Sequence, residues 1–154
     1  MSACYFAYGS NMNPQRVRER GIRFRNLEGA WLAGYRLSFD KASSAHPGTG
    51  HANVVYSPGS TVEGVLYWLE TPDQIEKMDR FESAPVNYSR EVVAVTLSAG
   101  SRQVWTWTYF ANPAVRRSGL KPPRSYLAHL LAGRPYLSVA YYESLAHQPC
   151  EESR

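Results

Sequence analysis

Two stretches of this chain hold residues that could carry out chemistry together. Near the start, Tyr8-Gly9-Ser10-Asn11 follows a short apolar run and precedes Asn13-Pro14, which is typical of a strand–turn–helix junction. Backbone N–H groups at a helix start lack partners, and the helix dipole favours negative charge there. The turn is therefore a candidate site for a small anion such as a carboxylate. The same spacing also fits an ordinary turn between a strand and a helix.

The second stretch is a predicted helix that ends near Glu82. Its start has the pattern of a capping box over Thr71–Gln74, with Pro72 at the first helical position. At 100° per residue, one face carries Ile75, Met78, Asp79 and Glu82. If the helix continues through Glu82, this carboxylate points inward, where burial raises its pKa and suits it to general acid/base work. If the helix frays at Phe81, Glu82 is an ordinary surface residue.

The elements between and around these stretches follow from local signals. Asn13 suits the N-cap of the first helix and Gly21 its C-terminal end. The arginines after the turn are best explained as a solvated helix face rather than a nucleic-acid patch, because no nucleic-acid reader motif accompanies them. These arginines are Arg16, Arg18, Arg20, Arg23 and Arg25.

The remainder of the chain alternates between strand and turn patterns and then turns helical. Trp105, Trp107 and Tyr109 share one face at period two, which indicates a wall of the core or of a barrel. Ser138 is a candidate N-cap for a last helix that ends near Leu145. We expect an extended segment over 26–41, a loop over 42–50, strands over 52–56 and 62–69 with a turn at 57–60, a hairpin over 88–110, a loop over 111–123, a helix over 125–132 and a frayed polar tail over 148–154.

The amino-acid composition restricts the kinds of protein that this chain could be. The 154 residues are 44% hydrophobic and 19% charged, with a net charge of +4, as in a globular protein of one domain over 1–154. We expect no signal peptide and no membrane span. Cys4 and Cys150 have no metal-like spacing and are expected to be free thiols, which predicts a cytoplasmic protein. His46 and His51 have no third ligand at a useful spacing, so we predict no metal site.

The residues resemble a known family, the γ-glutamylcyclotransferases and their AIG2-like relatives. Tyr5-Phe6-Ala7-Tyr8-Gly9-Ser10-Asn11-Met12 looks like the family signature, and Met78-Asp79-Arg80-Phe81-Glu82 resembles its Leu-Asp-x-x-Glu segment. Gly50 to Tyr67 resembles the strand pair of the family. Tyrosines recur where the family has them, at Tyr109, Tyr126 and Tyr141. The resemblance spans residue 5 to about 145.

The resemblance implies an α+β (mixed α/β) fold, a small distorted mixed β-barrel flanked by short helices, with the site at the mouth of the barrel. It implies that the α-amine of a small γ-glutamyl substrate attacks its own γ-carbonyl, which releases 5-oxoproline and an amine or amino acid. Glu82 would be the acid/base, and Tyr8, Gly9, Ser10 and Asn11 would hold carboxylate or carbonyl groups. Tyr126 would line the pocket, and Tyr88 and Tyr109 would orient Glu82 or the substrate. No cofactor is expected, nor a nucleic-acid or membrane partner, and the chain would act as a monomer or homodimer.

Two other functions compete with this one. A non-catalytic binding module would keep the same carboxylate-binding turn for a small ligand or a protein partner, although a pure binder has no evident use for an inward acid. A hydrolase built on Ser10 and a histidine lacks the sequence context of a nucleophile elbow. Many relatives have Gly directly after the catalytic Glu, whereas this chain has Ser83 after the bulky Phe81, which concerns the leaving-group side. The identity of the leaving amine stays open.

Overall fold

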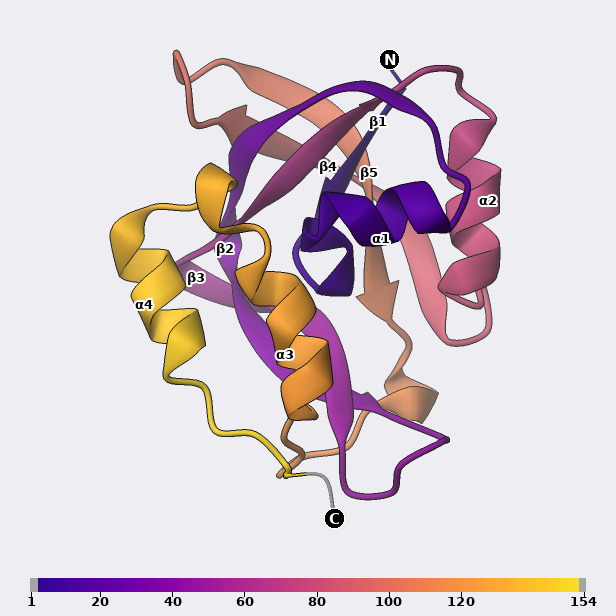
Figure 1. Ribbon diagram of the computed structural model, residues 1–154, viewed down its shortest axis with the longest axis vertical. Helices are drawn as coiled ribbons and strands as arrows, with labels where there is room; N and C mark the ends of the chain where they lie inside the picture. Colours follow the sequence, from indigo (N-terminus) through magenta and orange to yellow (C-terminus); the bar gives the residue numbers. More distant parts are fainter. Residues whose placement is uncertain (1–2, 153–154) are drawn as a thin grey trace.

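The computed structural model describes residues 3–152, whose strands close into a small barrel (Figure 1). The barrel order is β1-β3-β2-β4-β5, and β5 closes it by pairing in parallel with β1 at Tyr5 and Trp107. The other neighbouring strands pair antiparallel, so the sheet is mixed. The strands are β1 (Cys4–Ala7), β2 (Phe24–Ala42), β3 (Gly50–Leu69), β4 (Tyr88–Leu97) and β5 (Gln103–Ala111). The small mixed barrel implied by the family resemblance is confirmed.

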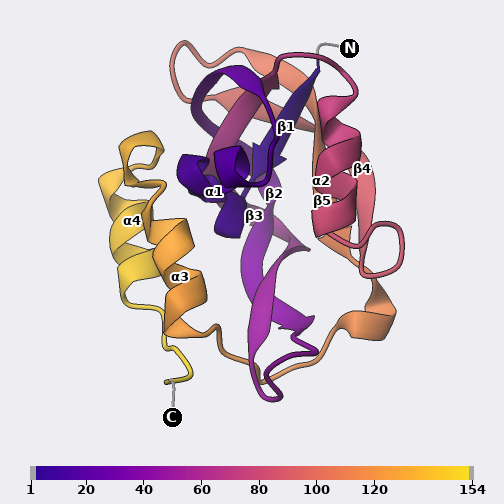
Figure 2. The ribbon, with the colours of Figure 1, turned by 45° about the vertical axis from the view of Figure 1, so that its right-hand side comes forward.

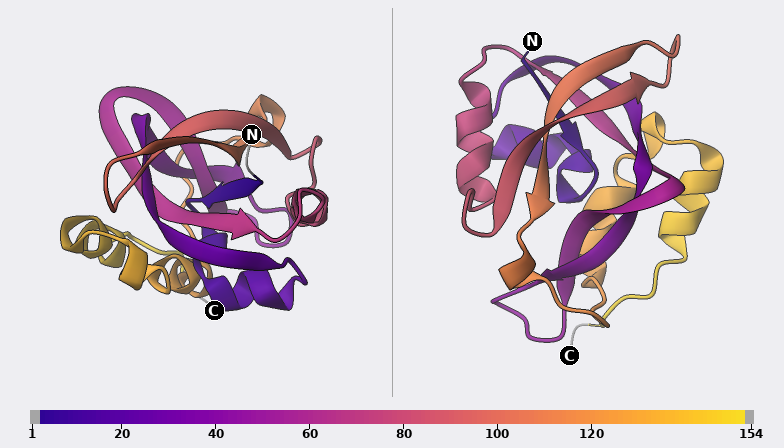
Figure 3. Two further views of the ribbon diagram at one scale, coloured as in Figure 1. Left: turned by 90° about the horizontal axis from the view of Figure 1, so that it is seen from above. Right: turned by 180° about the vertical axis from the view of Figure 1, so that it is seen from behind.

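Short helices flank the barrel on two sides. Figures 2 and 3 show α3 and α4 together on one side of the strands and α2 on the other. Within the described residues, no helix is both long enough and apolar enough to span a bilayer. The α-helices are α1 (Pro14–Glu19), α2 (Gln74–Phe81), α3 (Arg124–Leu131) and α4 (Val139–Ala146), and the 3-10 turns are η1 (Ser10–Met12), η2 (Pro113–Val115) and η3 (Arg134–Tyr136).

Two of the three predicted helix caps are observed in the structure, and one is not. The side chain of Asn13 accepts the N–H of Gln15, and the side chain of Ser138 accepts the N–H of Tyr141, so both predicted caps are confirmed. The predicted capping box of α2 is wrong, because the helix begins at Gln74 rather than at Pro72. The side chain of Gln74 instead accepts the backbone N–H of Arg23 at 2.9 Å, a tertiary bond that outweighs the local motif.

β2 and β3 form one long ribbon that extends beyond the barrel. The predicted turn at 57–60 is wrong, since β3 runs unbroken through these residues. Ala33 pairs with Thr61, and Tyr35 pairs with Tyr56, so residues 57–60 have no partners on β2. These residues form an irregularity in β3, where Gly59 has a φ of +85°. The ribbon bends there and carries its far end, around the 43–49 loop, away from the barrel and towards α3 (Figure 2).

β5 presents the side chains of Trp105, Trp107 and Tyr109 on one face of the barrel wall, opposite to Thr106 and Thr108. Thr106 and Thr108 are fully buried, and Thr108 donates its hydroxyl to the carbonyl of Phe6 at 2.9 Å. Trp105 is 63% exposed, whereas Tyr109 is buried beneath α2. The aromatic ladder is thus part of the wall, as predicted, and α2 covers its Tyr109 end.

The C-terminal tail is more ordered than the sequence suggests. Glu151 donates its N–H to the carbonyl of Pro122 at 2.9 Å, and it forms a parallel bridge with Pro123 just before α3. The prediction of a frayed tail over 148–154 is therefore wrong for residues 148–152, and residues 153–154 lie outside the described residues.

Candidate active site

One cavity brings together the predicted catalytic and substrate-binding residues. It has a volume of about 260 Å³ and lies between the β1–α1 junction, the C-terminal end of α2, the far end of the ribbon and the start of α3. We call it the inner cavity. The predicted site residues that line it are Tyr8, Gly9, Ser10, Asn11, Glu82, Tyr88, Tyr109 and Tyr126.

The turn after β1 is a 3-10 turn, not the direct start of α1. Gly9 precedes this turn. A side chain has little space there, since a Cβ at Gly9 would lie 3.0 Å from the Cβ of Ala52 and 3.1 Å from the hydroxyl of Tyr126. Tyr67 donates its hydroxyl to the carbonyl of Asn11 at 2.6 Å and fixes the turn from within the barrel.

Glu82 lies at the C-terminal end of α2 and faces the inner cavity. Its N–H bonds the carbonyl of Met78 at 3.0 Å, so helical hydrogen bonding extends through Glu82 and the side chain keeps to the inward face. The residue is half-buried, and its Oε1 accepts a hydrogen bond from Nδ2 of Asn11 at 3.1 Å. Of the two alternatives for α2, the inward carboxylate is the one observed.

The surroundings of Glu82 suit it to proton transfer near neutral pH. Burial raises the pKa of its carboxyl group from 4.5 to about 6, against the opposing pull of Arg20, Arg16, Lys41 and the bond from Asn11. The group is mostly ionised at neutral pH but takes up a proton readily. An acid/base catalyst needs this balance, because its pKa should lie near the working pH.

Asn11 connects the turn to Glu82. Its Nδ2 lies 3.0 Å from the hydroxyl of Tyr5 and 3.1 Å from Oε1 of Glu82, while its Oδ1 accepts a hydrogen bond from Arg20 at 3.0 Å. The side chain is 2% exposed and is held from both ends. The orientation of Glu82 therefore comes from Asn11.

The tyrosines form the wall of the inner cavity, and their hydroxyls bond protein groups other than Glu82. Tyr88 donates to the carbonyl of Ala52 at 2.8 Å, and Tyr126 accepts the N–H of the same residue at 3.0 Å. Tyr109 donates to Oδ1 of Asp79 at 2.6 Å, and Tyr8 donates to the carbonyl of Tyr109 at 2.5 Å. Among residues 3–152, neither Tyr88 nor Tyr109 forms a hydrogen bond with Glu82, and their role in orienting the substrate stays a prediction.

A further family tyrosine, Tyr141, lies on α4 and lines a separate hollow. The structure does not bring it to the inner cavity.

Sequence reasoning missed the cations of the inner cavity. Arg16 and Arg20 both line it, whereas Arg18 is exposed, so the prediction of one solvated face is wrong for two of these arginines. Lys41 lines it as well and is only 8% exposed. Its position after Phe39 continues the period-two pattern of buried residues in β2, and that was the available signal. None of the described residues forms an ion pair with Lys41.

His51 forms part of the cavity wall. Its ring stacks on Tyr126 with centroids 4.4 Å apart. Burial, together with Lys41, Arg16 and His46, lowers the pKa of His51 to about 4, so the ring is neutral at pH 7. Among residues 3–152, no group of three or more His, Cys, Asp or Glu side chains could hold a metal ion.

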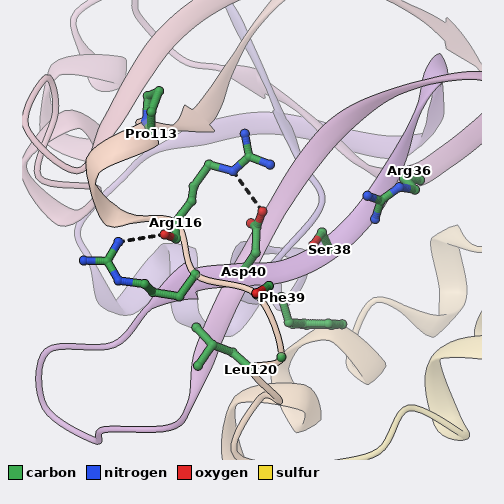
Figure 4. A pocket seen from close by; sticks show the side chains of 10 residues that line it. Arg36, Ser38, Phe39, Asp40, Pro113, Arg116 and Leu120 are labelled. Atoms are coloured by element: carbon green, nitrogen blue, oxygen red, sulfur yellow. Dashed lines mark hydrogen bonds and ion pairs between the residues drawn. The ribbon is translucent and has the colours of Figure 1, made fainter.

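Another hollow, of about 520 Å³, lies between β2 and the segment after β5 (Figure 4). Arg116 pairs there with Asp40 at 2.9 Å, and Arg36 lies apart from this pair. Its arginines are exposed, and none of the predicted site residues lines it. The inner cavity is therefore the better candidate for an active site.

Comparisons with known proteins agree with this fold. A family model described as γ-glutamyl cyclotransferase, AIG2-like, matches residues 5–128. A comparison with curated protein sequences finds no match. Among solved structures, the uncharacterized protein loc79017 from Homo sapiens has a TM-score of 0.85 at 24% identity, over 99% of this chain and 91% of that one.

Two further solved structures have similar scores. One named γ-glutamyl cyclotransferase has a TM-score of 0.83 at 23% identity, over 98% of this chain and 90% of that one. YkqA from Bacillus subtilis has a TM-score of 0.82 at 25% identity, and the match covers 97% of this chain but 56% of YkqA. The barrel and its flanking helices are thus shared with proteins of low sequence identity.

Proposed function

This chain belongs to the γ-glutamyl cyclotransferase, AIG2-like family, and on that premise we propose that it closes a γ-glutamyl amide or dipeptide to 5-oxoproline and releases a free amine or amino acid. One observation carries the proposal: the carboxylate of Glu82, with a pKa raised to about 6, faces the Gly9–Asn11 turn across one small cavity. A purely structural carboxylate would gain nothing from this costly placement.

In this reaction the nucleophile is the substrate's own α-amine. Glu82 takes a proton from the α-ammonium, and the freed amine forms a bond to the γ-carbonyl carbon. The bond from this carbon to the leaving nitrogen then breaks as Glu82 returns protons to that nitrogen. Two protons pass in total from the attacking to the leaving nitrogen, so the leaving group departs as an ammonium and Glu82 ends ionised. The reaction is intramolecular, so positioning and one tuned carboxylate suffice.

The glutamyl end binds in the inner cavity. The Gly9–Asn11 turn offers backbone N–H groups to carboxylate or carbonyl oxygens, and Lys41 offers an ammonium. Lys41 supports this assignment because it is buried, lines the inner cavity and has no ion-pair partner among the described residues. The glutamyl α-carboxylate supplies the missing partner.

The test is incubation with a panel of γ-glutamyl amides and dipeptides, with 5-oxoproline and free amine read by mass spectrometry. We expect turnover by the wild-type protein and none by Glu82→Gln. Glu76→Gln is the matched control, because Glu76 is exposed on the same helix. Full turnover by Glu82→Gln on an accepted substrate would show that Glu82 is not the acid/base.

The alternative functions make different predictions. A binding module would show thermal stabilisation by γ-glutamyl compounds without release of amine. A Ser10 hydrolase would need a histidine bonded to Ser10. Within the described residues, the histidine rings that form hydrogen bonds contact Asn13 and the carbonyl of Glu143 instead. A cytoplasmic location and a monomeric or homodimeric state are parts of the same proposal.

A further inference from the structure

A second, larger cavity adjoins the inner cavity. It has a volume of about 660 Å³ and lies between the 43–49 loop, the start of α3 and the C-terminal tail. We call it the outer cavity. Arg16, His51 and Tyr126 line both cavities, and we call these three residues the neck. A ligand that fills the inner cavity and passes the neck would place its remaining atoms in the outer cavity.

Arg16 is the charged member of the neck and lacks a partner. Its Nε is buried without a hydrogen bond within residues 3–152, and no carboxylate in that range forms an ion pair with its guanidinium. A buried guanidinium nitrogen without a partner is costly, since the group loses its hydration and gains nothing in exchange. A ligand with an anionic oxygen at the neck would remove this cost.

The other charged groups around the neck do not neutralise the charge of Arg16. His51 is neutral at pH 7 and adds no charge. The carboxylates that line the outer cavity belong to the tail, where Glu152 pairs with Arg124 and Glu151 is exposed. Glu19, on the same helix as Arg16, accepts a hydrogen bond from Gln15 at 3.3 Å. In the inner cavity the carboxylate of Glu82 is outnumbered by Arg16, Arg20 and Lys41, so the neck presents a net positive charge to a bound ligand.

We propose that the outer cavity accepts the leaving group and that Arg16 binds its carboxylate, so that γ-glutamyl α-amino acids are preferred over γ-glutamyl amines. This inference rests on the proposed cyclotransferase function. The leaving nitrogen must lie beside Glu82 to receive protons from it. In an α-amino acid the carboxylate carbon is two bonds from that nitrogen. Arg16 is close enough to Glu82 for each charge to affect the pKa of the other.

The two cations without partners match the two carboxylates of such a substrate. Lys41 lines the inner cavity only, where the glutamyl α-carboxylate binds, and Arg16 lies at the neck, where the leaving residue begins. An amine attached through a side chain, as in a γ-glutamyl-ε-lysine linkage, carries its carboxylate several bonds further out. A simple amine carries none. Both would leave Arg16 unpaired.

The experiment compares γ-glutamyl-alanine with γ-glutamyl-alaninamide, two substrates that differ only in the charge at the carboxylate position. We expect kcat/KM of the wild-type protein to be roughly ten- to a hundredfold higher for the alanine compound, the range of a hydrogen bond to a charged group. In Arg16→Gln this ratio should fall to about one. The matched control is Arg18→Gln, because Arg18 lies on α1 but lines neither cavity, and it should keep the wild-type ratio.

The outcomes separate this inference from the proposed function. Equal kcat/KM for both compounds in the wild-type protein would overturn the carboxylate subsite while the cyclotransferase function stands. A wild-type preference that Arg16→Gln retains in full would overturn the role of Arg16. Absence of 5-oxoproline from every γ-glutamyl compound would overturn both proposals. If Arg16→Gln fails to fold, the wild-type ratio alone still decides whether the outer cavity prefers a carboxylate.

Discussion

Replacing Glu82 by Gln should stabilise the folded protein while it removes activity. Glutamine keeps an oxygen that can accept the hydrogen bond of Asn11 but carries no charge into the cavity. Burial raises the pKa of Glu82 from 4.5 to about 6, so the folded protein binds a proton more tightly than the unfolded chain does. Ionised Glu82 therefore destabilises the fold above pH 6, and this penalty is absent below pH 4.5.

The size of the effect follows from the same pKa. At about 1.4 kcal/mol for each tenfold change in proton affinity, the penalty is about 2 kcal/mol, or roughly 4 to 8 °C in melting temperature for a chain of this length. Urea denaturation of wild-type protein and Glu82→Gln at about pH 8 and about pH 5 measures it, and the difference should shrink at the lower pH. Glu76→Gln should stay within about 0.5 kcal/mol of wild type.

A Glu82→Gln variant that is clearly less stable than wild type at about pH 8 would refute the reasoning. The carboxylate would then be a stabilising partner of the cations around it, and its placement would need no catalytic explanation.

Two further predictions concern the same cavity. The kcat/KM of the wild-type protein should fall as the pH drops through about 6, because the base must be ionised to take the proton of the α-ammonium, and a profile that stays flat to about pH 4.5 would contradict this role of Glu82. Lys41→Met should melt at a higher temperature, because burial lowers the pKa of Lys41 and the variant buries no ammonium, while KM for γ-glutamyl substrates should rise roughly tenfold or more. An unchanged KM in Lys41→Met would show that the glutamyl carboxylate binds elsewhere.

Local signals predicted those parts of the fold that depend on neighbours in the chain. The caps at Asn13 and Ser138 and the inward face of α2 follow from residues within one or two turns. The residues at 57–60 look like a turn by composition, but the opposing strand β2 continues past them, and the backbone takes them up as an irregularity of β3. The prediction for the start of α2 was also overturned by a contact distant in the chain, because the side chain of Gln74 bonds the backbone of Arg23.

The residues of the site likewise differ in how far the sequence could predict them. The signature turn and Glu82 were identifiable because the first matches a family motif and the second follows from helix geometry. Arg16 was not, because the direction of a long side chain on a six-residue helix depends on what packs above it. Lys41 was within reach of the period-two pattern of β2, but a lysine at a buried position contradicts composition-based expectation. Unpaired cations become visible only when the cavity around them is known.

The bent ribbon of β2 and β3 has a consequence for the motions of the protein. Its far end supplies Lys41 and His51 to the cavity, and the 43–49 loop between these two residues forms hydrogen bonds mainly within itself, from Ser43 to Thr49 and from Thr49 to His46. Opening this loop breaks these local bonds and leaves the barrel paired, so it costs less free energy than global unfolding. Backbone amides near the 43–49 loop should accordingly exchange with solvent faster than those of β1, and a bound ligand that bridges both walls should slow them.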